Sequence, residues 1–224
     1  MNPLAAVLPD AVATVARYDD EGVGPLHPSE EPAVAKAVAT RRAEFTTARA
    51  CAREALAALG AAAEAVPVGE KRSPVWPDGV VGSITHTRGF RGAAVGWASE
   101  VRSVGIDAEV HDVLPDGVLE AVSSESERAV LARLRAGHPD VHWDRLLFSA
   151  KESVYKTWFP LTGRWLGFEE AALTPSADGT FTAELLVPGP VVDGVTVSSF
   201  SGRWMVADGL VLTAIALPTQ PVSE

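Results

Sequence analysis

Two stretches of sequence decide the fold: Gly105-Ile106-Asp107-Ala108-Glu109 and Phe148-Ser149-Ala150-Lys151-Glu152-Ser153-Val154-Tyr155-Lys156-Thr157-Trp158. The first has the pattern of a strand end. Because residues two apart in a strand point to the same face, Asp107 and Glu109 are predicted to project together. The second has helical spacing, with Glu152 and Lys156 at i and i+4 on one face. A strand and a helix, each with charged groups on one side, are therefore expected.

These charged groups have the chemistry of a magnesium site. Carboxylate oxygens suit a hard octahedral cation that keeps positions open for water and substrate phosphate, and lysines would meet the phosphate oxygens. Taken singly, each pair is more simply a solvated surface feature, since an exposed i,i+4 ion pair contributes only about 0.3–0.5 kcal/mol. The presence of Lys151 and of the upstream segment Gly82-Ser83-Ile84-Thr85-His86 favours the joint site.

From about Arg41 to Trp165, the three segments resemble those of 4'-phosphopantetheinyl transferases, the group that serves siderophore, polyketide, fatty-acid and nonribosomal-peptide synthases. The resemblance implies an α+β fold made of two similar subdomains in a pseudo-twofold arrangement. Residues 1–103 would form the N-terminal subdomain on the nucleotide side, and residues 104–224 the C-terminal subdomain with the metal and the catalytic helix. The active site would lie at their interface. The order of predicted elements agrees with such a duplication.

The resemblance also implies an activity. Enzymes of this type, the holo-[acyl-carrier-protein] synthase type, move the 4'-phosphopantetheine arm of coenzyme A onto a serine of an apo acyl or peptidyl carrier protein, releasing adenosine 3',5'-bisphosphate. The implied metal is Mg²⁺, with Mn²⁺ as the alternative, on Asp107, Glu109 and Glu152, with the Ala108 carbonyl as a further contact. Glu152, directly or through a metal-bound water, would take the serine proton, and Lys156 would stabilise or protonate the departing phosphate. Asp107, Glu152 and Lys156 are thus the catalytic candidates.

Contacts to coenzyme A are implied for residues of both halves: Arg41, Arg49, Lys71, Thr85, His86, Lys151 and Lys156. Helix geometry leaves open which of Arg41 and Arg42 reaches the nucleotide, because Arg42, Arg49 and Arg53 share a stripe on which Arg41 does not lie. A lone histidine at a strand end is more often structural than a ligand, but His86 stands beside Thr85 and can help to hold a phosphate.

One departure from the family pattern concerns position 68. Relatives with the spacing seen at Trp76-Pro77-Asp78-Gly79 can carry a lysine there, whereas this chain has Val68. Lys71 or Arg72 is expected to take over that charge.

Composition restricts the partners and the compartment. The chain has 224 residues and a formal charge of -10, which argues against nucleic acid as the main partner. No segment reaches the roughly 18 apolar residues of a membrane span, and the start lacks the basic region of a secretion signal. A cytoplasmic monomer without membrane contact is expected. Cys51 is the single cysteine and is expected to be a small core residue rather than a nucleophile.

Secondary-structure signals in the first half predict one long helix and a hairpin. The helix covers residues 31–59, with Val34 and Val38 among the apolar positions and Gly60 at its end. Residues 80–97 read as two strands joined by a turn at 87–89.

In the second half, a strand carries Asp107, and Ser124 with Glu127 offers a capping box for a helix of about ten residues. Residues 133–144 read as a loop, and the helix with Lys151 is expected to end at Pro160 and Gly163. Residues 173–217 alternate strand and turn signals.

Two other classes of function fit parts of this pattern. A metal-dependent nucleotide pyrophosphohydrolase would use the same carboxylates, with water in place of the carrier serine. A non-catalytic carrier-binding module would share the fold, but it would have no need of three carboxylates and two lysines. Analysis of the reaction products distinguishes a pyrophosphohydrolase from a transferase. Metal-dependent binding of coenzyme A distinguishes a transferase from a non-catalytic module.

Overall fold

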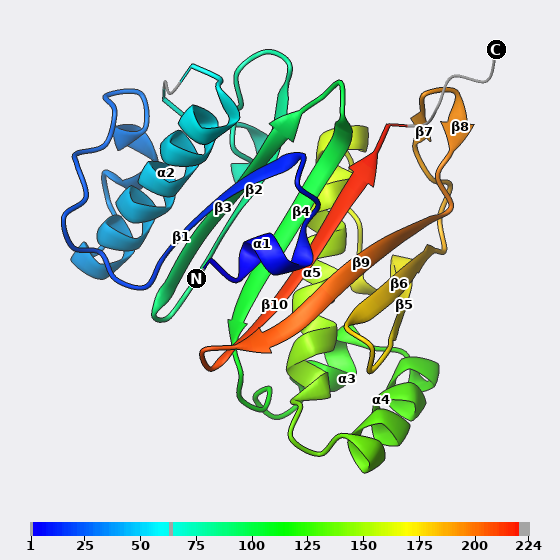
Figure 1. The fold of residues 1–224 in the computed structure, drawn as a ribbon. Helices are drawn as coiled ribbons and strands as arrows, with labels where there is room; N and C mark the ends of the chain where they lie inside the picture. Colours follow the sequence, from blue (N-terminus) through cyan, green and yellow to red (C-terminus); the bar gives the residue numbers. More distant parts are fainter. Residues whose placement is uncertain (1, 63–64, 220–224) are drawn as a thin grey trace.

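The structure, a computed structural model, describes residues 2–62 and 65–219 and has the predicted α+β fold. Two antiparallel sheets make up its centre (Figure 1). The first sheet has the order β1-β3-β2, from β1 (Val12–Arg17), β2 (Val80–Thr87) and β3 (Phe90–Trp97). The second has the order β4-β10-β9-β6-β5, from β4 (Val101–Val110), β5 (Ala171–Pro175), β6 (Thr180–Leu185), β9 (Ser199–Ala207) and β10 (Leu210–Pro218). The strands β7 (Val191–Val192) and β8 (Val195–Thr196) form a small separate hairpin.

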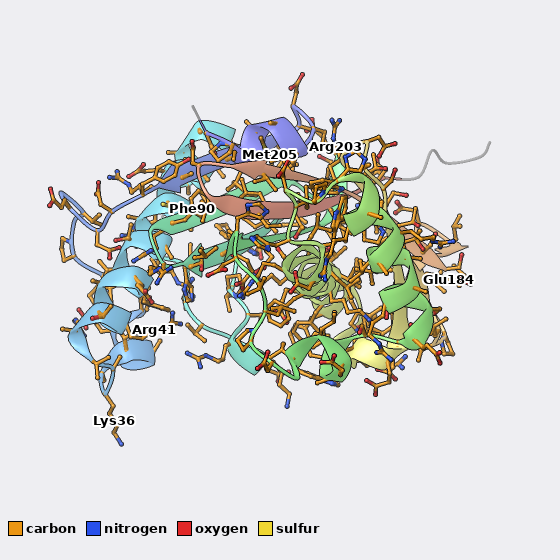
Figure 2. All side chains as sticks on the ribbon, turned by 90° about the horizontal axis from the view of Figure 1, so that it is seen from below. Lys36, Arg41, Phe90, Glu184, Arg203 and Met205 are labelled. Atoms are coloured by element: carbon orange, nitrogen blue, oxygen red, sulfur yellow. The ribbon has the colours of Figure 1, made fainter. Side chains whose placement is uncertain are left out.

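Helices cover both sheets. The long helices are α2 (Ala39–Leu59), which packs on the first sheet, and α5 (Trp143–Thr162), which packs on the second. In Figure 1, α5 lies behind β4 and β10, whereas the short α1 (Leu4–Val7) lies in front of them. The remaining helices are α3 (Val118–Val122), α4 (Glu125–Gly137) and the 3-10 turns η1 (Glu31–Val34), η2 (Glu70–Arg72) and η3 (Phe168–Glu170). Side chains fill the space between these layers (Figure 2).

The two faces of β4 have different neighbours, because side chains alternate along a strand. Val104, Ile106 and Ala108 are buried in a core shared with α1 and β1. The opposite face carries Gly105 and Asp107 and lies against α5. Strand alternation thus turns the predicted acidic side of β4 toward the predicted catalytic helix.

Helix α5 approaches β4 very closely at Gly105. A Cβ atom at this position would collide with the Ser153 carbonyl oxygen and with Thr157 of α5. The contact is also polar, because Ser103 donates a hydrogen bond of 2.8 Å to the Thr157 carbonyl oxygen. On β10, Thr213 bonds the Ser153 hydroxyl at 2.7 Å. Small residues on both elements therefore fix the position of α5 over the sheet.

Beside β2, the edge of β4 is joined to the first sheet by side-chain hydroxyls. Ser83 accepts a hydrogen bond from the Ile106 N–H at 3.1 Å, and Thr85 accepts one from the Ala108 N–H at 3.0 Å. Both hydroxyls are buried. They satisfy backbone donors that would otherwise have no partner at the junction of the two sheets. The chain passes from the first sheet to the second after Trp97. The subdomain boundary between residues 103 and 104 stays a prediction, as does the pseudo-twofold symmetry. Residues 1, 63–64 and 220–224 of the predicted ranges lie outside the described part.

Several local predictions are confirmed. Gly60 ends α2 in the left-handed conformation, and the strands β2 and β3 are joined by a tight turn in which Gly89 has a φ of 77°. Ser124 and Glu127 form the predicted capping box of α4. Cys51 is fully buried, and burial raises the pKa of its thiol to about 11, as expected for a core residue.

Three helix boundaries were predicted wrongly. The helix expected over residues 31–59 is interrupted, since η1 ends at Val34 and α2 begins only at Ala39. Val38, which was expected on the apolar stripe, is 73% exposed. Residues 133–137 belong to α4 rather than to a loop. Helix α5 begins at Trp143, inside the segment 133–144 that was predicted to be a loop. Its predicted end at Gly163 is confirmed, and Pro160 lies in the last turn, where a proline removes a single hydrogen bond without ending the helix. Within residues 2–62 and 65–219, no helix is long and apolar enough to cross a membrane.

The close approach at Gly105 predicts the effect of adding one methyl group. Gly105→Ala should lower the free energy of unfolding by about 1–3 kcal/mol, because the new Cβ forces α5 away from β4. The distance between Lys156 and Asp107 should increase as well, since α5 carries Lys156. Chemical denaturation measures the first effect. Gly137→Ala is the matched control, because a Cβ there meets nothing within 4 Å. Equal stability of the two variants would contradict the close packing.

The hydroxyl bridge predicts a cost for removing a single oxygen atom. Ser83→Ala leaves the buried Ile106 N–H without its partner and should lower the free energy of unfolding by about 1–3 kcal/mol. Denaturant titration checks this value against Ser201→Ala, which removes an exposed hydroxyl from β9. If the two serine variants unfolded at the same denaturant concentration, the bridge would contribute nothing to stability.

Candidate active site

Asp107 and Lys156 form the centre of the site, where β4 meets α5. The Lys156 ammonium lies 2.7 Å from Oδ1 of Asp107 and also donates a hydrogen bond of 3.0 Å to the Ile106 carbonyl oxygen. Thr85 donates to the same Asp107 oxygen at 3.3 Å. The second oxygen, Oδ2, is buried and has no hydrogen-bond partner. One oxygen of Asp107 is thus held by the protein, and the other is left for a ligand.

The other two predicted carboxylates lie close enough to Asp107 to interact with its charge. Burial, together with the charge of Asp107, raises the pKa of Glu109 to about 7. The same two causes raise the pKa of Glu152. Arg145, at 3.2 Å from Oε2 of Glu109, opposes the effect on that residue. Repulsion of Glu109 and Glu152 by the charge of Asp107 is therefore a property of this site.

These groups fit the implied magnesium ion, although they do not form a closed cage. Over the described residues, no group of three or more His, Cys, Asp or Glu side chains is assembled in a way that could hold a metal by itself. Mg²⁺ is usually held by one or two carboxylates together with substrate phosphates and water. The unpartnered Oδ2 of Asp107 and the raised pKa values of Glu109 and Glu152 agree with such an open site. The Ala108 carbonyl lies on the side of β4 that faces β2, since N–H and C=O of one strand residue point the same way.

A cavity of about 420 Å³ lies beside these groups, between β2 and α5. Its walls are partly apolar, from Trp76 and Ile84 on one side and Tyr155 and Phe159 on the other. The remaining lining includes charged groups of the site and of the preceding loop: Lys71, Arg72, Glu152 and Lys156. A site of this size can accept the flexible part of a phosphorylated ligand.

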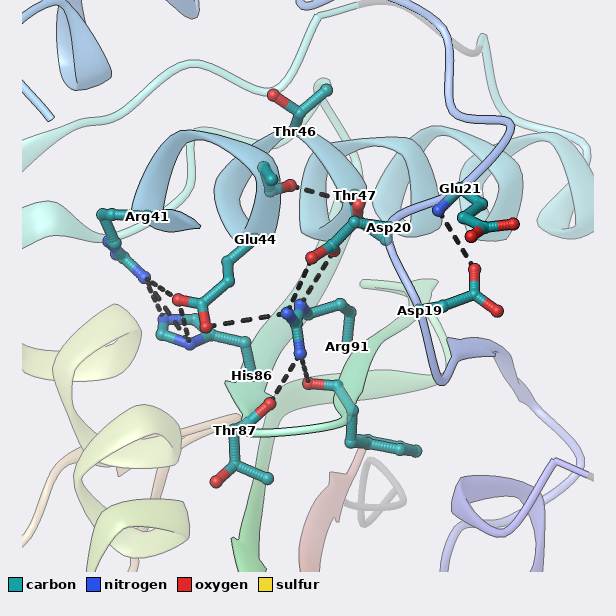
Figure 3. A network of polar contacts seen from close by, with 12 residues as sticks. Asp19, Asp20, Glu21, Arg41, Glu44, Thr46, Thr47, His86, Thr87 and Arg91 are labelled. Atoms are coloured by element: carbon teal, nitrogen blue, oxygen red, sulfur yellow. Dashed lines mark hydrogen bonds and ion pairs between the residues drawn. The ribbon is translucent and has the colours of Figure 1, made fainter. Parts of the chain in front are cut away.

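Arg41 and His86 lie on the N-terminal side of the site. Arg41 donates a hydrogen bond of 2.6 Å to Nε2 of His86, and Figure 3 shows both side chains together with Glu44 and Arg91. Burial, with the charges of Arg41 and Lys156, lowers the pKa of His86 to about 4, so the ring is neutral at pH 7. Arg91 is buried and bonds to Asp20, which fastens this corner to the loop after β1. Arg41, which also lies 3.7 Å from Glu44, thus holds its charge beside a neutral histidine.

The other arginines of α2 are engaged elsewhere. Arg42 pairs with Glu31, and Arg53 pairs with the buried Glu30 at 2.8 Å. Arg49 is 4% exposed and stacks its guanidinium on the Phe45 ring at 4.4 Å. Burial lowers the pKa of Arg49 to about 10. The structure therefore brings Arg41, rather than Arg42, to His86, and holds Arg49 within the α2 packing. Lys36, which precedes α2, projects away from the protein (Figure 2).

Lys71 and Arg72 lie in η2, on the loop that lines the cavity. Both have positive φ angles, 49° and 67°, which are unusual for residues with a side chain. The turn is closed by hydrogen bonds from Gly69 N–H to the Ser73 carbonyl and from Ser73 N–H to the Glu70 carbonyl. Backbone strain of this kind is concentrated at ligand sites. Both residues line the cavity. That one of them replaces the charge missing at position 68 stays a prediction.

Lys151 does not join the site. Its ammonium is buried and lies 3.0 Å from Glu127 of α4, and it donates to the carbonyl oxygens of Phe168 and Ala171 at 2.6 and 3.1 Å. An ammonium has three protons, so its donors are all used within the protein. Lys151 also lines a second cavity of about 250 Å³. Its contact to a substrate phosphate stays a prediction, and the internal hydrogen bonds of its ammonium argue against it.

Arg145 is the site residue that the sequence did not single out. It lies in the first turn of α5, directly after residues 133–144, which were predicted to be a loop. Arg145 precedes Glu152 by seven residues and Lys156 by eleven, so the three fall within about 20° of one helical stripe at about 100° per residue. That spacing is visible in the sequence, whereas the contacts of Arg145 to the carbonyl oxygens of Asp112 and Val113 are not.

The environment of Lys151 predicts a loss of stability when its charge is removed. Lys151→Met leaves Glu127 buried and unpaired and should lower the free energy of unfolding by about 3–5 kcal/mol. Denaturant titration measures this change, with Lys36→Met as a control at an exposed lysine. A Lys151→Met protein as stable as the control would contradict a structural role.

Comparisons with known proteins agree with the geometry. The model of the 4'-phosphopantetheinyl transferase N-terminal domain matches residues 29–96, and that of the 4'-phosphopantetheinyl transferase superfamily matches residues 103–204. The chain is 55% identical over 218 residues to 4'-phosphopantetheinyl transferase Svp of Streptomyces mobaraensis, covering 96% of this chain and 89% of the relative. It is 50% identical over 224 residues to 4'-phosphopantetheinyl transferase PptT of Mycobacterium tuberculosis, covering 96% and 97%.

A third relative, 4'-phosphopantetheinyl transferase Npt of Nocardia iowensis, is 53% identical over 199 residues, covering 85% of this chain and 88% of the relative. The matches extend over both sheets and over the elements that carry Asp107 and Glu152. The chain therefore belongs to the 4'-phosphopantetheinyl transferase superfamily.

Proposed function

We propose that this protein transfers the 4'-phosphopantetheine group of coenzyme A to a serine hydroxyl of an apo acyl or peptidyl carrier protein and releases adenosine 3',5'-bisphosphate. The observation that carries the proposal is the Asp107 carboxylate, with one oxygen fixed by Lys156 and Thr85 and the other unpartnered, beside a cavity bordered by Glu152. Membership of the superfamily and the names of the relatives support it.

Asp107, Glu109 and Glu152 are the residues that would hold the divalent cation, with the Ala108 carbonyl as a further contact. When bound, Mg²⁺ would neutralise charge on the pyrophosphate whose bond is broken. The charge of Asp107 repels both Glu109 and Glu152 where burial weakens their solvation, and such an arrangement favours a cation.

Glu152 is the proposed acceptor of the proton of the carrier serine, directly or through water. Burial and the charge of Asp107 raise its pKa, and a carboxylate with a raised pKa is a stronger base. Lys156 lies between Asp107 and the cavity, where its ammonium can stabilise or protonate the departing phosphate. Thr85 acts on Asp107 in this scheme, because its buried hydroxyl bonds to that carboxylate and to the Ala108 N–H.

Arg41, His86 and Lys71 are the proposed contacts to the nucleotide. Neutral His86 accepts from Arg41, which fixes the guanidinium, and guanidinium groups bind phosphate with good geometry. Lys71 lines the cavity and can meet a phosphate as a point charge. Arg49 is buried and stacked on Phe45, so it would stabilise α2. Its charge would act on the nucleotide without direct contact.

The proposal predicts a covalent product. Incubation of an apo carrier protein with this protein, coenzyme A and Mg²⁺ should add the mass of phosphopantetheine to the carrier serine, and chelation of the metal should prevent it. Intact-protein mass spectrometry measures the product, and a carrier with serine replaced by alanine is the control. Hydrolysis of coenzyme A without modification of the carrier would indicate a pyrophosphohydrolase instead. Binding of carrier without any reaction would indicate a non-catalytic module.

The role of Glu152 predicts a loss in the chemical step. Glu152→Gln keeps the size of the side chain but removes its charge, so single-turnover rates should fall by about 10²–10⁴-fold from the loss of the base alone. Glu169→Gln changes an acid in η3 that the proposal does not use. Retention of the normal rate by the Glu152 variant would remove Glu152 as base and as metal ligand together.

The contrast between two neighbouring arginines tests the nucleotide contact. Arg41→Met should raise the Michaelis constant for coenzyme A by about tenfold or more, because a hydrogen bond to a charged phosphate is lost. Arg42→Met should have little effect, since Arg42 is paired with Glu31. Steady-state kinetics on both variants checks this difference. A larger effect at Arg42 would reverse the assignment.

A further inference from the structure

The start of α5 is fastened to the segment that follows β4 by successive residues of the helix N-terminus. The His142 N–H donates to Nε2 of His111 at 3.0 Å, and the buried Asp144 accepts from the Leu114 N–H at 2.9 Å. The two rings of His111 and His142 also pack edge to face, with centroids 4.6 Å apart. The connection leaves the end of β4 little freedom relative to α5.

Arg145 makes the contact nearest to the site. Its Nε donates to the Asp112 carbonyl at 3.0 Å, one terminal nitrogen to the Val113 carbonyl at 2.7 Å, and the other to Oε2 of Glu109 at 3.2 Å. The side chain is 16% exposed. Because a guanidinium is a rigid planar fork, the two carbonyl bonds fix the direction in which the third bond meets Glu109.

This geometry has two opposite readings for a cation at the site. If Arg145 were only a counter-ion, it would compete for Glu109 and repel a divalent cation, so its removal would tighten metal binding. If it is a fixed support, it holds one carboxylate oxygen, leaves Oε1 for the metal, and prevents Glu109 from turning away, so its removal would weaken metal binding. The two carbonyl bonds, which a simple counter-ion would not need, favour the second reading.

We propose that Arg145 is a positioning residue that orients Glu109 for the divalent cation. The inference rests on the proposed function, because it takes Glu109 as a metal ligand. It adds a residue outside the predicted carboxylates and lysines. Hydrogen-bond partners that orient metal ligands typically change metal affinity by about 10–100-fold when they are removed.

The experiment measures metal binding directly. Mn²⁺ is titrated into the full-length protein with saturating coenzyme A, and the signal of free Mn²⁺ is followed by electron paramagnetic resonance, with coenzyme A alone as the blank. The variants are Arg145→Met and Arg145→Lys. Arg102→Met is the matched control, because Arg102 also bonds a carboxylate and a backbone carbonyl, those of Asp193 and Ala98, at another place in the fold. Melting temperature and the affinity for coenzyme A without metal report on folding.

Arg145→Met is expected to weaken Mn²⁺ binding by about 10–100-fold while folding and metal-free binding of coenzyme A stay close to those of Arg102→Met. Arg145→Lys should also weaken it, because a lysine ammonium cannot reproduce the fork that meets Glu109 and two carbonyls. Unchanged or tighter binding in the methionine variant, or full recovery in the lysine variant, would overturn the positioning role while leaving the proposed function intact. Wild-type protein that retains no more Mn²⁺ than coenzyme A alone would remove the metal from the proposed function and this inference with it.

Discussion

The close approach of α5 to β4 at Gly105 is the constraint on which the site depends. Where the helix lies this near, Lys156 reaches both the Ile106 carbonyl and the Asp107 carboxylate. A side chain at position 105 would separate the two elements, and the ion pair would have to span the added distance. Packing in proteins leaves few gaps, so small residues at one crossing determine the geometry of charged groups two residues away.

The second consequence of that crossing is electrostatic. Three acids are collected at the end of β4 and on the facing side of α5, and the protein supplies Lys156 and Arg145 as fixed cations among them. The formal charge of the chain is -10, so an anionic substrate gains nothing from the overall field at long range. At physiological salt, screening limits that repulsion to about 8 Å, so the proposed binding of phosphate would depend on the local cations.

Much of this arrangement could be predicted from sequence, because it follows from local periodicity. Alternation in the strand placed Asp107 and Glu109 together, four-residue spacing placed Glu152 near Lys156, and the capping box located the start of α4. The start of α2 could not be predicted, because no side chain caps it, and Val38 is exposed despite its apolar character. Arg145 was missed since its contacts are to backbone carbonyls of a segment that has no regular pattern. Hydrogen bonds of that kind depend on tertiary structure alone.

Helix geometry gives the two lysines of α5 different surroundings. Lys151 and Lys156 are five residues apart, which is about 140° around a helix, so they cannot both face one ligand from α5. Lys156 faces β4 and the site, whereas Lys151 faces α4 and η3, where it neutralises the same Glu127 that caps α4. The buried pair of Lys151 and Glu127 also connects α5 and α4 to β5, because Lys151 donates to the Ala171 carbonyl oxygen and Glu127 accepts from the Leu173 N–H. Helix α5 is thus fixed on one side by the close packing at Gly105 and on the other by the ion pair of Lys151 with Glu127. Glu152 follows Lys151 in the sequence, so these two contacts together determine its position at the cavity.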